Sequence, residues 1–562
     1  MLTHLRTRIS LAAVALLALV AAAPPQPRPQ LSLGETIEVS IVNLDVVVTD
    51  KAGNRVRGLT QNDFEVLEEG KPQPITNFAE YGNGTAVSDS HSGVESAAGV
   101  APRPQPRTIV IFVDDFHLNL TKSTPMFDAM KEMLRKSVRP GDAVAVISYA
   151  NGFRGNVQYT DDLNQLIAAI DRIADERRRP HLEDALVAQA LSDVQQIEGV
   201  AGANEGRSGI RQPIRSSLVG RTSPTMMLAA RQQQLLLRRK ADILTTLMST
   251  MAGNEGRKVL LFVSHRFSRI AGGEYLFGRQ AGPVNLSDRA DFDNSKVINR
   301  VAQAANTYGV TIYPIYPEGL DTNDGNTSGA NAYEILNNES QALGQIAAQT
   351  GGLYDWGSQP AAELLPKVTE DFDTYYSLAY RKQTSGEDRV HTVTVKTKNP
   401  DYHVRSRQQF VEKSDESKMK ERVLAELFRP STAKGIQFAL HIAQPKVKSG
   451  KTTLPLTLKI PISLLTAIPQ GNASVGEFSV YIASANDRGQ LSDVTRQTQP
   501  FSIKESELAR AKSSSFTYDV DVVIDRDTDR IAIGVVDNVS KEFGLARITV
   551  PSGIALAANV TR

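Results

Sequence analysis

The sequence of 562 residues contains no cysteine. This absence excludes a disulfide framework and a lipid-modified cysteine, so the folded parts must rely on packed cores. Beyond the N-terminal region, no apolar run is long enough to span a bilayer. The formal net charge of +1 gives no indication of a nucleic-acid or acidic partner. We therefore expect a folded protein with neither nucleic-acid binding nor a membrane span beyond its start.

Recognisable catalytic motifs are also missing. The histidines never form His-Glu-x-x-His, and no serine stands in Gly-x-Ser-x-Gly. Gly450-Lys451-Thr452 resembles the end of a phosphate-binding loop, but Pro445 stands where the earlier glycine is needed. The aspartates that start at Asp525 have calcium-loop spacing, but Arg530 replaces the required glycine. These failures favour a protein that is not an enzyme.

The N-terminus has the pattern of an export signal. Arg6 and Arg8 precede an apolar run over 9–20, which ends in three alanines before a proline pair. A basic start, a short apolar core and a small-residue cleavage site predict a Sec-type signal peptide over 1–23. An uncleaved anchor is the alternative. We expect a bacterial protein located in the periplasm, in the medium or on the cell surface.

Composition divides the region after the signal into short units. Residues 24–36 are Pro-rich and polar, which predicts a linker. Residues 37–81 hold alternating apolar positions separated by turns, which predicts a small β domain. Residues 82–106 are rich in Gly, Ser, Ala and Pro without periodicity, so we expect a disordered linker there.

A strand–helix rhythm begins at residue 107 and predicts a central α/β domain over 107–411. Its strands are apolar runs and its helices have apolar residues at i, i+3 and i+4. The predicted strands cover 107–113, 143–149, 258–263 and 310–316. The predicted helices cover 124–137, 161–173, 225–251, 295–308, 339–350 and 361–373. We expect a doubly wound, Rossmann-like parallel sheet, with an insertion at 175–224 and closing antiparallel strands at 375–411.

The last part of the chain predicts a helical connector and a β domain. Residues 412–435 are charged and helical in pattern. From 436 to 562, strand patterns alternate with turn residues, which indicates a C-terminal β-sandwich. The expected fold class is thus multidomain α/β plus β, with a central doubly wound sheet flanked by N-terminal and C-terminal β-sandwich-like domains.

Polar side chains gather directly after the first strand of the central domain. Asp115, His117 and Asn119 alternate there, so an extended chain would direct all three side chains to one side. Asp114 is the alternative first acid of this motif. In open α/β sheets, ligands bind beyond the carboxyl ends of the strands. By contrast, we expect the basic cluster Arg238-Arg239-Lys240 to be a solvated helix face.

These features together resemble a known family. An early strand that ends in Asp-x-polar-x-polar resembles the von Willebrand factor A (VWA) fold, in which Asp-x-Ser-x-Ser begins a metal-ion-dependent adhesion site. The order of further motifs over 37–411 resembles the exported acidobacterial VWFA-related group. They are Asp50-Lys51-Ala52-Gly53, Gly58-Leu59-Thr60, Asp63-Phe64-Glu65-Val66, Glu69-Gly70-Lys71, Arg139-Pro140-Gly141-Asp142, Thr160-Asp161-Asp162 and Thr374-Tyr375-Tyr376-Ser377.

The resemblance implies a metal site, but the sequence departs from its ligand pattern. His117 and Asn119 stand where the family has serines, and Ser264 lies near the position of its later aspartate. No threonine stands in the segment 181–186, where the family's threonine ligand is expected. We expect no resident metal; the alternative is Mg²⁺ or another divalent cation on Asp115, His117 and Asn119.

The sequence favours a protein-interaction module of the adhesion or scaffold type, with a degenerate metal-ion-dependent adhesion site. The expected partner is a protein that docks at the carboxyl edge of the central sheet, at Asp114, Asp115, Ser264 and His265. The main alternative is an exported metal-dependent hydrolase that uses Asp115, His117 and His265. A structural cell-surface protein is a third possibility. The sequence names neither the partner nor the oligomeric state.

Overall fold

The structure of the chain is a computed structural model. It describes residues 39–82, 85–91, 106–114, 123–149, 159–176, 224–264, 267–273, 290–317, 329–355, 361–383, 386–431, 435–448, 451–486, 488–525 and 527–550. The predicted signal peptide (1–23), the linker 24–36 and nearly all of the insertion at 175–224 lie outside these residues.

A parallel sheet forms the centre of the molecule. Its order is β7-β6-β8-β9, and all three pairings are parallel. The strands are β6 (Arg107–Val113), β7 (Ala143–Ser148), β8 (Arg257–Val263) and β9 (Val310–Ile315). Every residue of β6 is buried, which explains its unbroken run of β-branched and aromatic residues.

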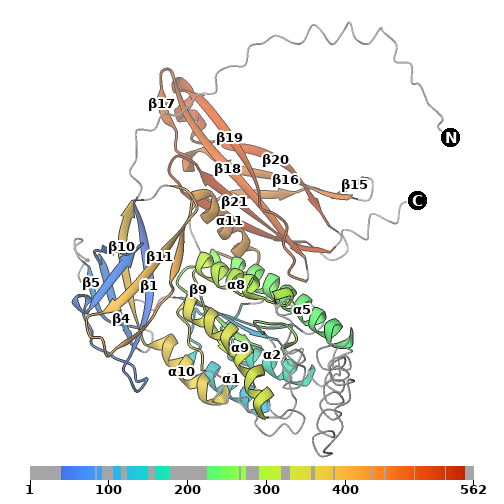
Figure 1. The fold of residues 1–562 in the computed structure, drawn as a ribbon. Coiled ribbons are helices and arrows are strands. Elements are labelled where there is room, and N and C mark those ends of the chain that lie inside the picture. Colours follow the sequence, from blue (N-terminus) through green and yellow to red (C-terminus); the bar gives the residue numbers. More distant parts are fainter. Residues whose placement is uncertain are drawn as a thin grey trace, which may run out of the picture.

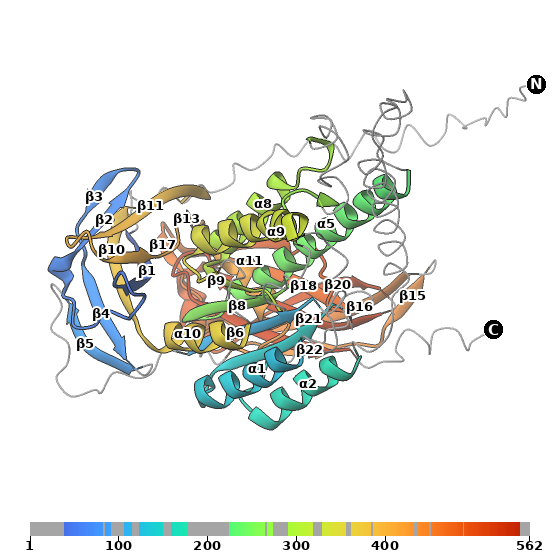
Figure 2. The same ribbon diagram turned by 60° about the horizontal axis from the view of Figure 1, so that its bottom comes forward.

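Helices cover both faces of this sheet (Figure 2). One face packs against α1 (Thr124–Ser137), α2 (Leu163–Glu176) and α10 (Ala361–Asp373). The other face packs against α5 (Pro224–Ala252), α8 (Ser295–Tyr308) and α9 (Gly329–Thr350). Alternate residues of β6 supply the two cores: Ile109 and Ile111 face the first set of helices, while Val110 and Phe112 face the second.

The strands after α10 correct one expectation. We predicted that 375–411 would close the central domain, but these strands pair instead with the N-terminal β segment. One sheet has the order β12-β1-β10-β4-β5 and the other β13-β11-β2-β3. The strands are β1 (Val39–Thr49), β2 (Phe64–Glu68), β3 (Lys71–Gln73), β4 (Asn77–Gly82), β5 (Thr85–His91), β10 (Tyr375–Gln383), β11 (Arg389–Thr397), β12 (His403–Arg405) and β13 (Gln409–Glu412).

These two sheets share one core and form what we call the N-terminal sandwich. Figure 1 shows the blue strands of the first segment beside the yellow-orange strands that follow the α/β domain. The expected β domain over 37–81 is therefore only half of a unit, because β10 lies between β1 and β4 and completes their sheet. The α/β domain is inserted into the sandwich between its two halves.

The expected linker at 82–106 also needs correction at its start. Strand β5 pairs antiparallel with β4 over Asn77–Gly82, with a register shift between Glu80 and Tyr81. Small and polar residues do not prevent such a strand, because backbone hydrogen bonds need no particular side chain. Of the rest of this range, only Pro106 lies within the described residues.

A short helix, α11 (Asp415–Glu426), lies within the predicted connector and separates the α/β domain from the C-terminal strands (Figure 1). Its side chains Met419 and Val423 belong to a core that reaches from the central sheet to the last β domain. At Gly534 on the facing strand, a Cβ would lie 2.3 Å from the end of the Met419 side chain and 2.7 Å from Val423, so a larger residue would displace these side chains.

The C-terminal strands form two sheets around one core. The first contains β14 (Ala439–Ile442), β15 (Lys446–Lys448), β16 (Lys451–Pro461) and β20 (Ser515–Ile524). The second contains β17 (Ile468–Gln470), β18 (Ala473–Asn486), β19 (Thr495–Lys504), β21 (Thr528–Asp537) and β22 (Phe543–Thr549), and the short helix α12 (Leu508–Ala511) follows β19. None of the helices in the described residues is long and apolar enough to cross a membrane.

Candidate functional site

The carboxyl edge of the parallel sheet brings together two of the residues singled out from the sequence. Asp114 follows β6 and Ser264 follows the neighbouring strand β8, and both are completely buried. The hydroxyl of Ser264 donates a hydrogen bond to Oδ2 of Asp114 over 2.7 Å. The backbone N–H of Asp114 donates to the carbonyl of Val263 over 2.8 Å, which holds the acid in line with the sheet.

The other predicted site residues cannot be placed in this way. Asp115, His117, Asn119 and His265 lie outside the described residues. The expected metal set and half of the expected partner-binding edge therefore stay predictions. The sequence offered Asp115 or Asp114 as the first acid of the strand-end motif. Asp114 is the one that the structure describes, and its side chain lies inside the fold.

A lysine completes the buried cluster at this edge. Nζ of Lys240, from α5, lies 2.5 Å from Oδ2 of Asp114, and its side chain is only 2% exposed. The second carboxylate oxygen, Oδ1, has no hydrogen-bond partner in the described structure. Removing two charges from water is costly unless they pair closely, and this geometry supplies such a pair.

Arg238 and Arg239 are exposed as expected, but Lys240 is buried, so the expectation of a solvated basic cluster was wrong for this one residue. The helix α5 is amphipathic at this point, and Lys240 stands four residues after Leu236 and four before Leu244, both of which are buried. A residue at that spacing lies on the same face as its apolar neighbours. The spacing in the sequence therefore indicates that Lys240 is buried. A charged residue on an apolar helix face requires a buried partner.

Asp114 does not suit a divalent metal ion. Its Oδ2 already accepts from the Lys240 ammonium and the Ser264 hydroxyl. A cation bound to the same carboxylate would lie close to the ammonium, and two unit charges about 4 Å apart repel by roughly 4 kcal/mol at an effective dielectric constant of 20. In the part of the chain that the structure describes, no three acidic or histidine side chains form a group that could hold a metal.

The opposite edge of the sheet is closed by arginines. Arg107 starts β6 and donates from Nε to Asp142 over 3.1 Å; Arg257 starts β8 and donates from Nη2 to the hydroxyl of Tyr313 over 3.1 Å. Burial raises the pKa of Tyr313, and the charge of Asp371 acts in the same direction. Arg107 also pairs with Asp373 of α10 over 3.3 Å, and Arg257 pairs with Asp45 of β1 over 3.5 Å, so this edge attaches the sheet to α10 and the N-terminal sandwich.

A second buried charge cluster lies inside the N-terminal sandwich. Nδ1 of His391 lies 3.0 Å from Glu68, Nε2 lies 3.3 Å from Glu412, and Nζ of Lys382 contacts both glutamates. The hydroxyl of Tyr380 donates to Glu68 over 2.8 Å. The sequence reading missed this cluster, although His391 alternates with the buried residues Val393 and Val395 along β11. The cluster joins strands from both halves of the sandwich.

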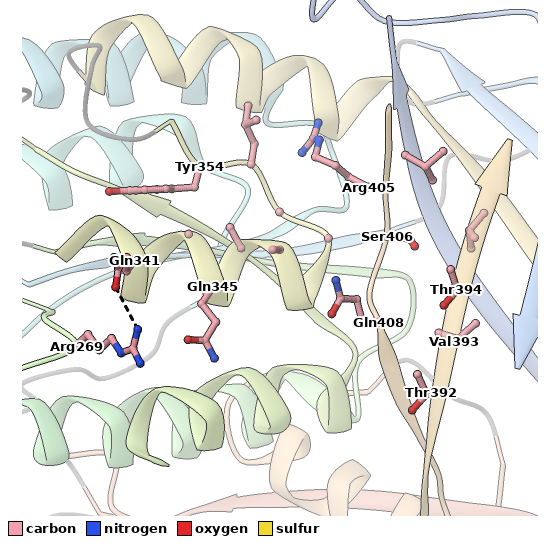
Figure 3. Close-up of a pocket in the computed structure, with 18 residues that line it drawn as sticks. Arg269, Gln341, Gln345, Tyr354, Thr392, Val393, Thr394, Arg405, Ser406 and Gln408 are labelled. Atoms are coloured by element: carbon pink, nitrogen blue, oxygen red, sulfur yellow. Dashed lines mark hydrogen bonds between the residues drawn. The ribbon is translucent and has the colours of Figure 1, made fainter. Parts of the chain in front are cut away.

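A groove of about 850 Å³ lies between α9 and the N-terminal sandwich (Figure 3). One wall carries Gln341 and Gln345 of α9, and the other carries Thr392, Thr394 and Gln408. Among the lining residues, Gly351 has φ +81°, and a Cβ there would lie 2.7 Å from the backbone of Ser406. Sequence analysis did not find this groove, because its walls come from segments that pair only in the folded chain.

Comparison with known proteins gives little guidance. No family model matches the chain, and no curated protein matches it. Among solved structures, the chain is similar to a β-glucosidase from Kluyveromyces marxianus in complex with glucose, with 10% identity over 54% of this chain and 32% of that chain, at a TM-score of 0.13. The selenomethionine-labelled form of the same enzyme matches with 10% identity over 55% of this chain and 33% of that chain, at a TM-score of 0.14. The chain thus spans about a third of these proteins, and TM-scores this low carry no argument about fold or function.

Proposed function

We propose that this chain is an exported, non-enzymatic interaction module of the VWA type, acting in adhesion or as a scaffold. A protein partner docks at the carboxyl edge of the central parallel sheet. Export rests on the signal-like residues 1–23, and the VWA assignment rests on the order of motifs over 37–411. Placement of the binding surface follows the general rule that open α/β sheets bind ligands beyond their strand ends.

The observation that carries the proposal is the internal pairing of Asp114. Its carboxylate is fully buried and held by Lys240 and Ser264. An acid in this state neither bridges a metal to a partner nor activates water, because its charge is already neutralised inside the fold. Recognition at this edge therefore uses surface groups, and the metal-ion-dependent adhesion site is degenerate. Mg²⁺ or another divalent cation is not required.

The alternative is an exported hydrolase with a metal on Asp115, His117 and His265. These residues lie outside the described part of the chain, and no described contact favours this activity. A third possibility, a structural protein of the cell surface, differs from the proposed interaction module mainly in where the protein is located. Our preference for the interaction module rests on the internal pairing of Asp114 with Lys240 and Ser264.

Capture of partners by the immobilised full chain tests the proposal. The source is the exported protein fraction of the native cells, with Mg²⁺ or with EDTA. We expect a defined partner in both conditions. Charge reversal by Asp291→Lys, an exposed position just before α8 at the carboxyl edge, should weaken capture. Lys136→Glu, at the exposed end of α1 on the opposite edge, is the matched control and should not. No partner, or a partner held only with Mg²⁺, would contradict the proposal.

A further inference from the structure

The groove beside α9 has two strand edges in its wall. β12 is the last strand of its five-stranded sheet, and it pairs only with β1 among the described strands. In the other sheet, β13 pairs with β11 only as far as Thr392. One further backbone bond, from the N–H of Val393 to the carbonyl of Gln408, ends that ladder. Residues of both edges, from Val393 to Val395 and from Val404 to Ser406, line the groove.

Strand edges in a groove favour an extended peptide as the occupant. An edge strand presents backbone donors and acceptors at the spacing of another strand, which is why peptides add to such edges. The volume of about 850 Å³ lies in the range of ligand-binding clefts. Thr392 and Thr394 of β11 line the groove with exposed side chains that carry hydroxyl groups.

Both walls supply polar side chains with unused hydrogen-bonding capacity. Nε2 of Gln345 donates to Asn299 over 2.6 Å, which leaves its carbonyl oxygen for another donor. The side chain of Gln408 makes no hydrogen bond within the described residues, although its backbone N–H donates to Gln349. Amides in such positions match the alternating N–H and C=O groups of a peptide backbone.

Charge in the groove selects an acidic ligand. No acidic residue is among those that line it, and its only charged lining residues are Arg269 and Arg405. Both Nη atoms of Arg405 are held by Asp371, at 2.8 and 2.9 Å, so its charge is compensated. Arg269 is exposed, its Nη1 donates only to the neutral Gln341 over 3.2 Å, and no carboxylate of the described residues forms a salt bridge with it. Figure 3 shows Arg269 and Gln341 at one end of the groove.

We propose that this groove binds an extended acidic peptide, which adds as a strand at the open edge of β11, beside β12 of the other sheet, and places a carboxylate on Arg269. The groove follows the flank of α9 towards the sandwich, and only its Arg269 end, in the segment after β8, approaches the carboxyl edge of the sheet. Peptide binding is measured without a natural partner, so its failure would leave the proposed docking at the sheet edge untouched.

The test measures fluorescence anisotropy of a labelled twelve-residue probe of alternating Thr and Glu, titrated with the full chain. We expect saturable binding. Arg269→Gln should weaken it by about tenfold, because a charge-assisted hydrogen bond is lost. The control Arg300→Gln removes another exposed arginine, which lies on α8 outside the groove and pairs with Asp242, and it should leave affinity within about twofold.

Three further probes separate strand addition from simple charge attraction. A Thr-Lys version should not bind, because the groove carries no acid. A Thr-Glu version with N-methylated backbone amides should bind at least about tenfold more weakly, because it cannot form a ladder. An acidic oligogalacturonate should not compete with the labelled peptide. The proposal is overturned if the Thr-Glu probe does not bind, if Arg269→Gln and Arg300→Gln weaken binding equally, if methylation has no effect, or if the oligosaccharide competes.

Discussion

Nζ of Lys240 lies 2.5 Å from Oδ2 of Asp114, at the carboxyl end of the first strand of the parallel sheet, and both side chains are buried. The helix α5 thus delivers a fixed positive charge to a strand-end acid. This relationship underlies the proposed function, because it assigns the acid to the interior of the fold. It also leads to measurable consequences for stability.

Breaking the pair from one side should be costly. Lys240→Met leaves the Asp114 carboxylate charged and buried without a partner. Asp114→Asn leaves the Lys240 ammonium in the same state. Each variant should lower the free energy of unfolding by ~3 kcal/mol or more. The double variant buries no charge and should lose clearly less than the sum, which a double-mutant cycle from urea unfolding measures.

The exposed pair Arg300–Asp242 is the matched control for this cycle. Its ion pair has nearly the same length, 2.6 Å, but its side chains are 50% and 65% exposed. Solvent screening should limit its coupling energy to below ~1 kcal/mol. Equal coupling in the two cycles would show that burial adds nothing to the Asp114–Lys240 pair.

A second buried acid connects the α/β domain to the N-terminal sandwich. Asp371 of α10 pairs with Arg405 of β12 over 2.8 Å and with Arg55 from the loop after β1. Asp371→Asn should destabilise the chain by ~3 kcal/mol or more, since both guanidinium groups lose their counter-charge. The control Asp401→Asn removes an ion pair with Lys51 that is more than 60% exposed, and should cost less than ~1 kcal/mol. Thermal unfolding of both variants checks this; equal shifts would contradict the role of Asp371.

Lys258 should make stability depend on alkaline pH. Burial lowers the pKa of Lys258 from 10.5 to about 8, and the charges of Lys413 and Arg407 act in the same direction. Between about pH 8 and pH 10.5 the unfolded chain therefore binds more protons at this amine than the folded protein, so its contribution to the unfolding free energy rises with pH. Below about pH 8 the penalty for charging this partly buried amine is complete.

The variant Lys258→Met removes this penalty. It should be more stable than the parent protein at pH 7, by at most about 3 kcal/mol, and the difference should shrink towards zero by about pH 10.5. Urea unfolding at several pH values measures this difference in unfolding free energy between the variant and the parent protein. The exposed Lys459→Met serves as the control and should show no such trend. A difference in unfolding free energy that does not change with pH would contradict the lowered pKa of Lys258.

The sequence predicted individual elements well where periodicity is strong. The helices Ser295–Tyr308 and Ala361–Asp373 and the strand Arg107–Val113 have the expected bounds, because their apolar spacing and end residues are unambiguous. Gly309, in the left-handed conformation with φ +67°, ends the first of these helices, as expected.

Pairing between distant segments was not predictable in the same way. The alternation along β10 identifies its buried face, but nothing in it indicates that Tyr376 pairs with Val46 and Glu80 on either side. Local patterns specify a strand and its faces, and the partner depends on contacts across hundreds of residues. For this reason the closing strands were assigned to the wrong domain, and the groove at their edge was missed.

The candidate site was predicted only in part. Ser264 was expected beside the strand-end acid, and the structure brings its hydroxyl to Asp114. Lys240 was assigned to the surface, because charge was given more weight than its place between Leu236 and Leu244. A lysine on an apolar helix face indicates a buried counter-charge, and Asp114 provides it.

The central claim is that Lys240, and not a metal ion, supplies the positive charge at the strand-end acid. Isothermal titration calorimetry of the full chain with Mg²⁺ and Mn²⁺ at neutral pH, after treatment with EDTA, tests it most directly. The account predicts no stoichiometric binding of either ion. A saturable site that binds one ion per chain, and that is lost in Asp114→Asn, would contradict it.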